Sequence, residues 1–137
     1  MKLLKKRSVR FLLVSVVAVA CAAAWGLGRA ERSRSSAEAR LIGRWQRPDG
    51  GYVLEIRGVE GGGRLAVRYF NPSPINVSRA EWTSNLGRFA VFVELRDRNY
   101  PGATYELAYV PETDRLRGVY YQPLLGQPFD VEFARAP

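Results

Sequence analysis

Histidine is absent from this chain of 137 residues, and cysteine occurs only once, as Cys21. The part that follows Cys21 therefore has no Ser-His-Asp or Cys-His catalytic arrangement, no thiol nucleophile and no His- or Cys-ligated metal site. A lone cysteine forms no intramolecular disulfide, so the fold must depend on its hydrophobic core. The sequence also lacks an Asp-rich calcium loop of the EF-hand type. We therefore expect no cofactor, no metal and no enzymatic activity.

Lysine is confined to the first six residues, and the excess of positive charge is just as uneven. Residues 1–40 carry nine basic and two acidic side chains, whereas residues 41–137 carry twelve basic and eleven acidic ones. The net charge of +8 and the pI of about 10.1 thus come mainly from the N-terminal part. Nucleic-acid binding requires a basic face on the folded domain itself. A nearly neutral domain offers none, so we expect no nucleic-acid partner.

Only one long apolar run is present, at residues 11–28, and it follows the basic residues of segment 1–10. This pattern is typical of a secretory signal or an N-terminal membrane anchor. A helix of eighteen residues is about 27 Å long, close to the minimum for crossing a bilayer. The pattern predicts export, with the folded domain on the periplasmic or extracellular side and a membrane as partner of the N-terminal segment.

Three interpretations of this leader stay open. Kept intact, it is a membrane anchor with the basic residues inside. Cleaved after a small-x-small triplet such as 28–30, it leaves a soluble secreted domain. In the third interpretation the protein is a lipoprotein, because residues 18–21 resemble a bacterial lipobox and Cys21 would be acylated.

The sequence predicts three segments: a signal peptide or membrane anchor at 1–29, a linker at 30–40 and one folded domain at 41–137. The linker is rich in Ser, Ala, Glu and Arg and shows no apolar stripe, which predicts a solvated segment.

From residue 41 onward, apolar side chains recur with a period of two, as in half-buried strands. Turns rich in Gly, Pro, Asn and Asp separate these segments. The fold class we predict is all-β: an antiparallel up-and-down meander that closes into a small eight-stranded barrel, preceded by one N-terminal hydrophobic helix. A β-sandwich is the alternative. The eight predicted strands lie near residues 43–45, 53–57, 65–70, 77–83, 88–96, 104–109, 116–121 and 129–133.

The segment Leu41-Ile42-Gly43-Arg44-Trp45 resembles the Gly-x-Trp opening of the calycins, the lipocalin and avidin group of eight-stranded barrels. This resemblance implies that Gly43 and Trp45 close one end of the barrel, with a ligand site at the other end. It also implies a late-strand arginine packed on the tryptophan, and Arg117 and Arg135 are the two candidates.

Every second connection of the predicted meander lies at the same barrel end, and those near 46–52, 70–76, 96–101 and 122–128 hold six of the eight prolines. Rigid loops with amide and aromatic side chains suit recognition, because function often lies on loops held by a stable scaffold. We therefore predict an extracytoplasmic binding or accessory module for a small molecule, glycan or peptide. The candidate ligand-binding residues are Asn71, Asn76, Arg96, Asp97, Asn99, Tyr100, Gln122 and Gln127.

Two other interpretations stay open. The prolines could serve only to cap the barrel and block edge pairing, in a structural or interaction protein of the cell envelope with a filled barrel and no small ligand. Glu94 and Glu106 could form the carboxylate pair of a glycosidase. Cross-strand ion pairs with neighbouring arginines explain these two carboxylates more simply.

Overall fold

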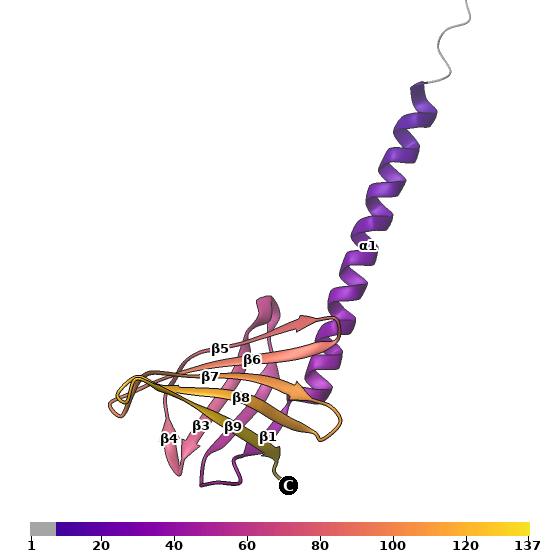
Figure 1. The fold of residues 1–137 in the computed structure, drawn as a ribbon. Coiled ribbons are helices and arrows are strands. Elements are labelled where there is room, and N and C mark those ends of the chain that lie inside the picture. Colours follow the sequence, from indigo (N-terminus) through magenta and orange to yellow (C-terminus); the bar gives the residue numbers. More distant parts are fainter. Residues whose placement is uncertain (1–7) are drawn as a thin grey trace, which may run out of the picture. The chain divides into compact units, whose positions relative to one another are not determined.

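The computed structural model describes residues 8–137, with side chains from Trp25 onward, and divides the chain after Ser35 into two compact units. Helix α1 spans Ser8–Leu41, so its last turns belong to the second unit. That unit is otherwise built of strands, with one short 3-10 helix, η1 (Gly61–Gly63), between two of them (Figure 1). They are β1 (Gly43–Gln46), β2 (Val53–Val59), β3 (Leu65–Asn71), β4 (Ser73–Ile75), β5 (Val77–Asn85), β6 (Arg88–Asp97), β7 (Tyr100–Val110), β8 (Arg115–Gln122) and β9 (Gln127–Arg135).

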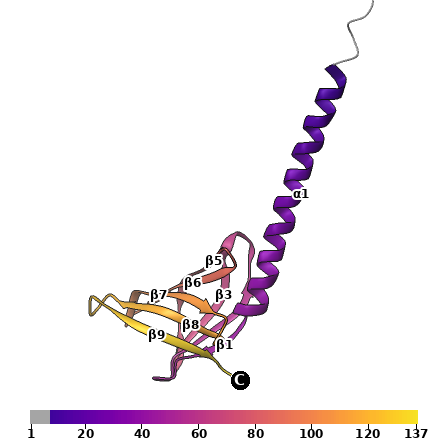
Figure 2. The ribbon, with the colours of Figure 1, turned by 45° about the vertical axis from the view of Figure 1, so that its right-hand side comes forward.

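The strands form one antiparallel sheet in the order β4-β3-β2-β1-β9-β8-β7-β6-β5. Because β1 pairs with both β2 and β9, the two ends of the chain's meander meet, and the sheet curls round on itself (Figure 2). A single bridge between Arg64 and Glu81 links β3 to β5 across the remaining seam. The structure therefore confirms the predicted all-β antiparallel meander, which forms a nearly closed barrel after one N-terminal helix.

Strand β4 is additional to the eight predicted strands. It was not predicted because its segment has the composition of a proline-rich loop. It pairs with the end of β3, where Phe70 lies opposite Pro74. A proline has no N–H to donate and is tolerated only where no ladder bond is needed on that side. Strand β4 meets this condition because it lies at the edge of the sheet.

Residues 30–40, predicted as a solvated linker, are helical and form part of α1. Their Ala, Glu and Arg side chains favour a helix. Ala37 and Leu41 lie four positions apart, hence on one helix face, and both are fully buried in the barrel core. Two apolar side chains are too few to form a visible stripe, which explains why the sequence pattern missed this contact.

No helix in the described part of the chain is both long and apolar enough to cross a membrane. Cys21, the predicted lipidation site, lies within α1, but its side chain is outside the described residues.

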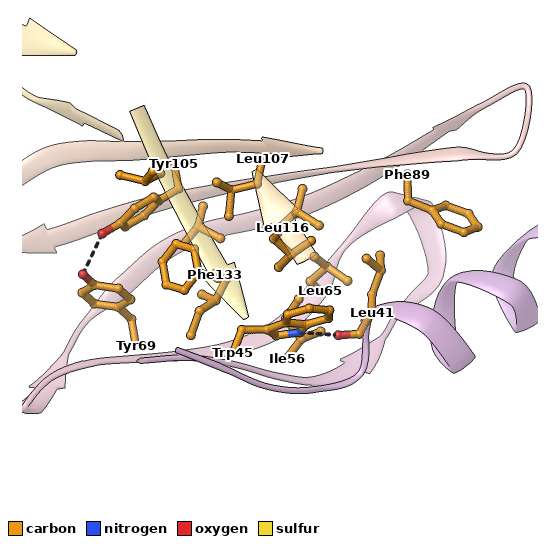
Figure 3. Close-up of a cluster of buried hydrophobic side chains, with 14 of the residues drawn as sticks. Leu41, Trp45, Ile56, Leu65, Tyr69, Phe89, Tyr105, Leu107, Leu116 and Phe133 are labelled. Atoms are coloured by element: carbon orange, nitrogen blue, oxygen red, sulfur yellow. Dashed lines mark hydrogen bonds between the residues drawn. The ribbon is translucent and has the colours of Figure 1, made fainter. Parts of the chain in front are cut away.

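The barrel interior is filled by large side chains (Figure 3). Trp45, Tyr69, Tyr105 and Phe133 are the largest of the fully buried ones, and they contact one another partly through edge-on and tilted ring pairs. At Gly118 in β8, an added Cβ would lie 1.9 Å from the carbonyl oxygen of Glu106 in β7. Two strand backbones thus approach each other closely at this point.

Candidate functional site

The turns β1–β2, β3–β5, β6–β7 and β8–β9 lie at one end of the barrel, which we call the loop end. A meander of antiparallel strands brings every second connection to the same side, so the predicted recognition residues gather here. All eight lie in or beside these turns.

Polar side chains join three of these turns. Asn71, at the end of β3, donates from Nδ2 to the hydroxyl of Tyr100 at the start of β7. Asn76 donates its backbone N–H and its Nδ2 to the two carboxylate oxygens of Asp97, each over 2.9 Å. These contacts hold the β3–β5 and β6–β7 turns together.

Gln122, at the end of β8, connects the third turn, β8–β9, to the β6–β7 turn. Its Nε2 lies 3.5 Å from the backbone oxygen of Asn99 and 3.2 Å from the hydroxyl of Tyr120. Gln127 is exposed and lies opposite Gln122 in the β8–β9 ladder. Arg96 contributes its backbone N–H to Asn76, whereas its guanidinium is exposed and lies 3.7 Å from Glu94.

Beneath these contacts lies a tyrosine network that the sequence analysis did not single out. The hydroxyls of Tyr69 and Tyr105 are 2.8 Å apart and buried (Figure 3). The ring of Tyr105 lies 4.6 Å from that of Tyr120, and the Tyr69 ring lies 6.5 Å from that of Tyr100. Tyr69, Tyr105 and Tyr120 occupy inward positions in the loop-end halves of their strands. In the sequence, these three tyrosines share apolar positions of the period-two pattern, and this is the feature by which they could have been predicted.

Arg47 lies in the β1–β2 turn, the fourth turn of the loop end, and contacts this tyrosine network. Its guanidinium pairs with Asp49, lies 4.3 Å above the ring of Tyr52 and approaches the hydroxyl of Tyr105 to 3.5 Å. Burial alone would lower the pKa of Arg47, but the hydrogen bonds to Asp49 and Tyr105 outweigh it, and the pKa is raised. The arginine therefore stays charged.

Burial raises the pKa of Tyr69, Tyr105 and Tyr120 above the ordinary value for a phenol. For Tyr105 the hydrogen bonds to Tyr69 and Arg47 oppose this effect without cancelling it. At neutral pH these hydroxyls are protonated. They serve as hydrogen-bonding groups of a packed network and supply no base or nucleophile.

Three hollows of the described surface open to solvent on the barrel wall, and one of them runs along the seam between β3 and β5. The most apolar of them, of about 410 Å³, lies over β5 to β8, where Ala90, Ala108 and Gly118 leave space beside Phe92 and Arg117. The interior beneath is occupied by the core side chains. A ligand of the loop end would consequently lie against the outside of the turns.

Trp45 lies against the C-terminal end of α1. Its ring is fully buried, and its Nε1 donates to the carbonyl oxygen of Leu41 over 2.9 Å (Figure 3). Of the two arginines considered from the sequence, Arg135 lies over this ring, with Cζ 4.1 Å from the centroid. Arg117 instead pairs with Glu132 on the barrel wall.

Gly43 provides the space for this arrangement. Its φ of +145° is one that other residues rarely adopt, and an added Cβ would lie 2.6 Å from Nη1 of Arg135. Arg135 also donates to the carbonyl oxygens of Arg40 and Ile42, at the C-terminal end of α1. A cation at this position satisfies carbonyl groups that the helix itself leaves without partners.

The carboxylates considered for glycoside hydrolysis do not form a buried pair. Glu94 lies opposite Thr104 and Glu106 opposite Phe92, so the two are offset along β6 and β7. Glu94 accepts a hydrogen bond of 2.6 Å from Ser78 and lies 3.7 Å from Arg96 of its own strand, so this ion pair is not the cross-strand pair that was predicted. Within the described residues, no group of His, Cys, Asp and Glu side chains could hold a metal ion.

Comparison with known proteins found no match: no family model, no curated protein and no solved structure is significantly similar to this chain.

Proposed function

We propose that this protein is an exported binding or accessory module that recognises a small molecule, glycan or peptide on the outer surface of its loop end. The observation that carries this proposal is the set of contacts Asn71–Tyr100, Asn76–Asp97 and Gln122–Asn99, which ties three turns together. Side chains held in this way lose little conformational entropy when a ligand binds, so they suit recognition.

The filled interior supports a ligand site outside the barrel. Tyr69 and Tyr105 occupy the space below the turns, so binding inside the barrel would require them to move. Exposed amides at the surface, such as those of Asn76, Asn99 and Gln127, offer both donors and acceptors to hydroxyl or peptide groups.

We further propose that the barrel is calycin-like. The contacts of Gly43, Trp45 and Arg135 support this: a glycine without room for a side chain, a buried tryptophan and a late-strand arginine over its ring. Under this proposal Trp45 marks the closed end, and recognition belongs to the opposite end.

The proposed place of action is outside the cytoplasm. The basic segment 1–10 and the apolar run 11–28 support export, with the leader kept as an anchor, cleaved or lipidated at Cys21. The first and third forms would hold the barrel near a membrane.

The filled barrel also favours a second candidate function, that of an envelope protein that acts through protein contacts and takes no small ligand. Apart from the short edge strand β4, eight strands enclose the interior, a number at which side chains just fill it. Trp45, Tyr69, Tyr105 and Phe133 are its largest fully buried side chains.

Thermal melting of the purified protein against sugars, peptides and envelope fragments separates the two candidates, because a ligand of the native state raises the melting temperature. We expect one ligand class to raise it, and Asn71→Ala or Tyr100→Phe to abolish the rise. The matched control is Asn85→Ala, an exposed asparagine at the other barrel end, which should leave the rise unchanged. A cooperative melt that no ligand class shifts would favour the interaction protein.

A further inference from the structure

The hairpin of β8 and β9 holds an unusual share of the exposed apolar surface. Among the residues with described side chains, nine large apolar ones are exposed, and five of these lie in this hairpin. They are Val119 (38%), Tyr121 (42%), Leu124 (63%), Leu125 (65%) and Phe129 (39%). Scattered apolar residues on a surface need no explanation, but a concentration on one element marks an interaction site.

Leu124 and Leu125 form the apex of this hairpin, and the turn that carries them is well defined. The N–H groups of Leu125 and Gly126 donate to the carbonyl oxygens of Gln122 and Pro123, each over 3.2 Å. Gly126 has a φ of +62°, which a glycine adopts without strain. The N–H of Leu124 lies 3.4 Å from Oε1 of Gln122. The turn thus keeps two adjacent leucine side chains exposed to solvent.

Positive charge lies beside this apex. Gln122 reaches the backbone of Asn99, so the β6–β7 turn with Arg96 and Arg98 is the neighbour of the β8–β9 turn (Figure 2). Both arginines are exposed. Asp97, the carboxylate between them, accepts hydrogen bonds from Asn76. A hydrogen bond from a neutral amide leaves the charge of Asp97 in place, and the guanidinium of Arg96 lies 3.7 Å from Glu94. Arg98 is therefore the exposed cation that this turn presents.

An apolar apex, aromatic rings behind it and an exposed arginine at its side match the layers of a bilayer surface. Leucine suits the acyl region, tyrosine and phenylalanine suit the boundary, and arginine suits anionic headgroups. A protein partner fits less well, because a stable protein interface covers about 800 Å² on each side, far more than two leucines at a convex turn.

We propose that the β8–β9 turn inserts Leu124 and Leu125 into the surface of a lipid bilayer that carries anionic headgroups, with Arg98 at the headgroups. This contact lies at the same barrel end as the recognition of a soluble ligand proposed above, but a dye on the turn reports on it alone, so the two proposals can fail separately. The contact is separate from any contact made by the apolar run 11–28.

A fluorescent label at the turn tests the proposal in the full chain. Cys21 is the only cysteine, so a Cys21→Ser background allows a polarity-sensitive dye to be placed on Leu125→Cys alone. With vesicles of phosphatidylcholine and phosphatidylglycerol we expect the emission to shift to the blue and to rise at least about twofold, as for a group that leaves water. The matched control is Leu86→Cys, an exposed leucine in the turn between β5 and β6, whose dye should not respond.

The dye reports on the turn itself, so a response does not depend on how the rest of the chain reaches the vesicles. We expect Arg98→Gln, or vesicles of phosphatidylcholine alone, to weaken the response severalfold, since each arginine near an anionic surface adds to binding. Leu124 and Leu125 are exposed, so the double change to serine should leave the melting temperature unchanged while a dye on Phe129→Cys loses its response. A chain that floats with the vesicles while the Leu125→Cys dye stays in water would overturn the proposal.

Discussion

Arg135 and Trp45 lie directly opposite each other where β9 pairs with β1, and the guanidinium of Arg135 covers the tryptophan ring at 4.1 Å. The same guanidinium pairs with Asp114 over 2.6 Å and donates to two carbonyl oxygens at the end of α1. One side chain thus joins the first strand, the last strand, the β7–β8 turn and the helix end.

We expect Arg135→Ala to lower the free energy of unfolding by about 2–3 kcal/mol, from the lost charge-assisted hydrogen bonds and the lost cation–π contact. Arg135→Lys should recover only part of this, because an ammonium group lacks the planar fork. Urea unfolding measures both. Arg117→Ala is the control: this arginine is more than half exposed, so its loss should cost less than about 1 kcal/mol. Equal losses for the two arginines would contradict the role assigned to Arg135.

Asp114 should make stability depend on acid pH. The hydrogen bond from Arg135 lowers the pKa of Asp114 below its ordinary value of 3.8, and the hydroxyl of Tyr109 adds to this. A carboxyl whose pKa is lower in the folded state stabilises the fold above its ordinary pKa, and this contribution disappears as pH falls through the lowered value. Stability measured in urea should therefore fall below about pH 4, and Asp114→Asn should make this fall shallower. Glu112→Gln, an exposed change in the same turn, should leave the slope as it is.

Removing one or the other hydroxyl of the buried pair Tyr69 and Tyr105 should lower the free energy of unfolding by different amounts. Tyr105→Phe leaves the Tyr69 hydroxyl buried without its partner, which costs about 1–3 kcal/mol. Tyr69→Phe leaves the Tyr105 hydroxyl near Arg47, so we expect a loss of about 1 kcal/mol or less. Chemical unfolding of both variants and of the double variant gives the coupling free energy between the two hydroxyls. A larger loss for Tyr69→Phe would show that Arg47 does not support Tyr105.

Gly118 should tolerate no side chain. A Cβ at this position would overlap the carbonyl oxygen of Glu106, and a backbone atom cannot turn aside as a side chain can. We expect Gly118→Ala to cost at least about 2 kcal/mol in thermal or urea unfolding. Gly58→Ala is the matched strand control, since its nearest neighbour would be the Cβ of Ala66 at 3.8 Å, an ordinary contact. A well-folded Gly118→Ala protein with wild-type stability would mean that β7 and β8 lie further apart.

The strands and most of their bounds were predictable because a half-buried strand repeats every two residues, as Val91, Val93 and Leu95 do in β6. Strand β4 was not, because pairing of a three-residue proline-containing edge depends on the β3 edge beside it. The site was predictable at the level of which turns share a barrel end, since alternation in a meander fixes that. The partners within it, such as Asn76 with Asp97, were not, because they depend on the exact path of two turns.

By itself, the sequence determined the all-β class, the antiparallel order and the residues that face inward, since these follow from local periodicity and turn chemistry. Only the tertiary structure decided that Arg135 rather than Arg117 covers Trp45, that Ala37 and Leu41 complete the core, and that tyrosines fill the space below the loop end. Each of these contacts joins residues from strands, turns or a helix end that meet only when the sheet closes. These contacts depend on side-chain direction and on distances across the nearly closed barrel. No local stretch of the sequence determines either of these.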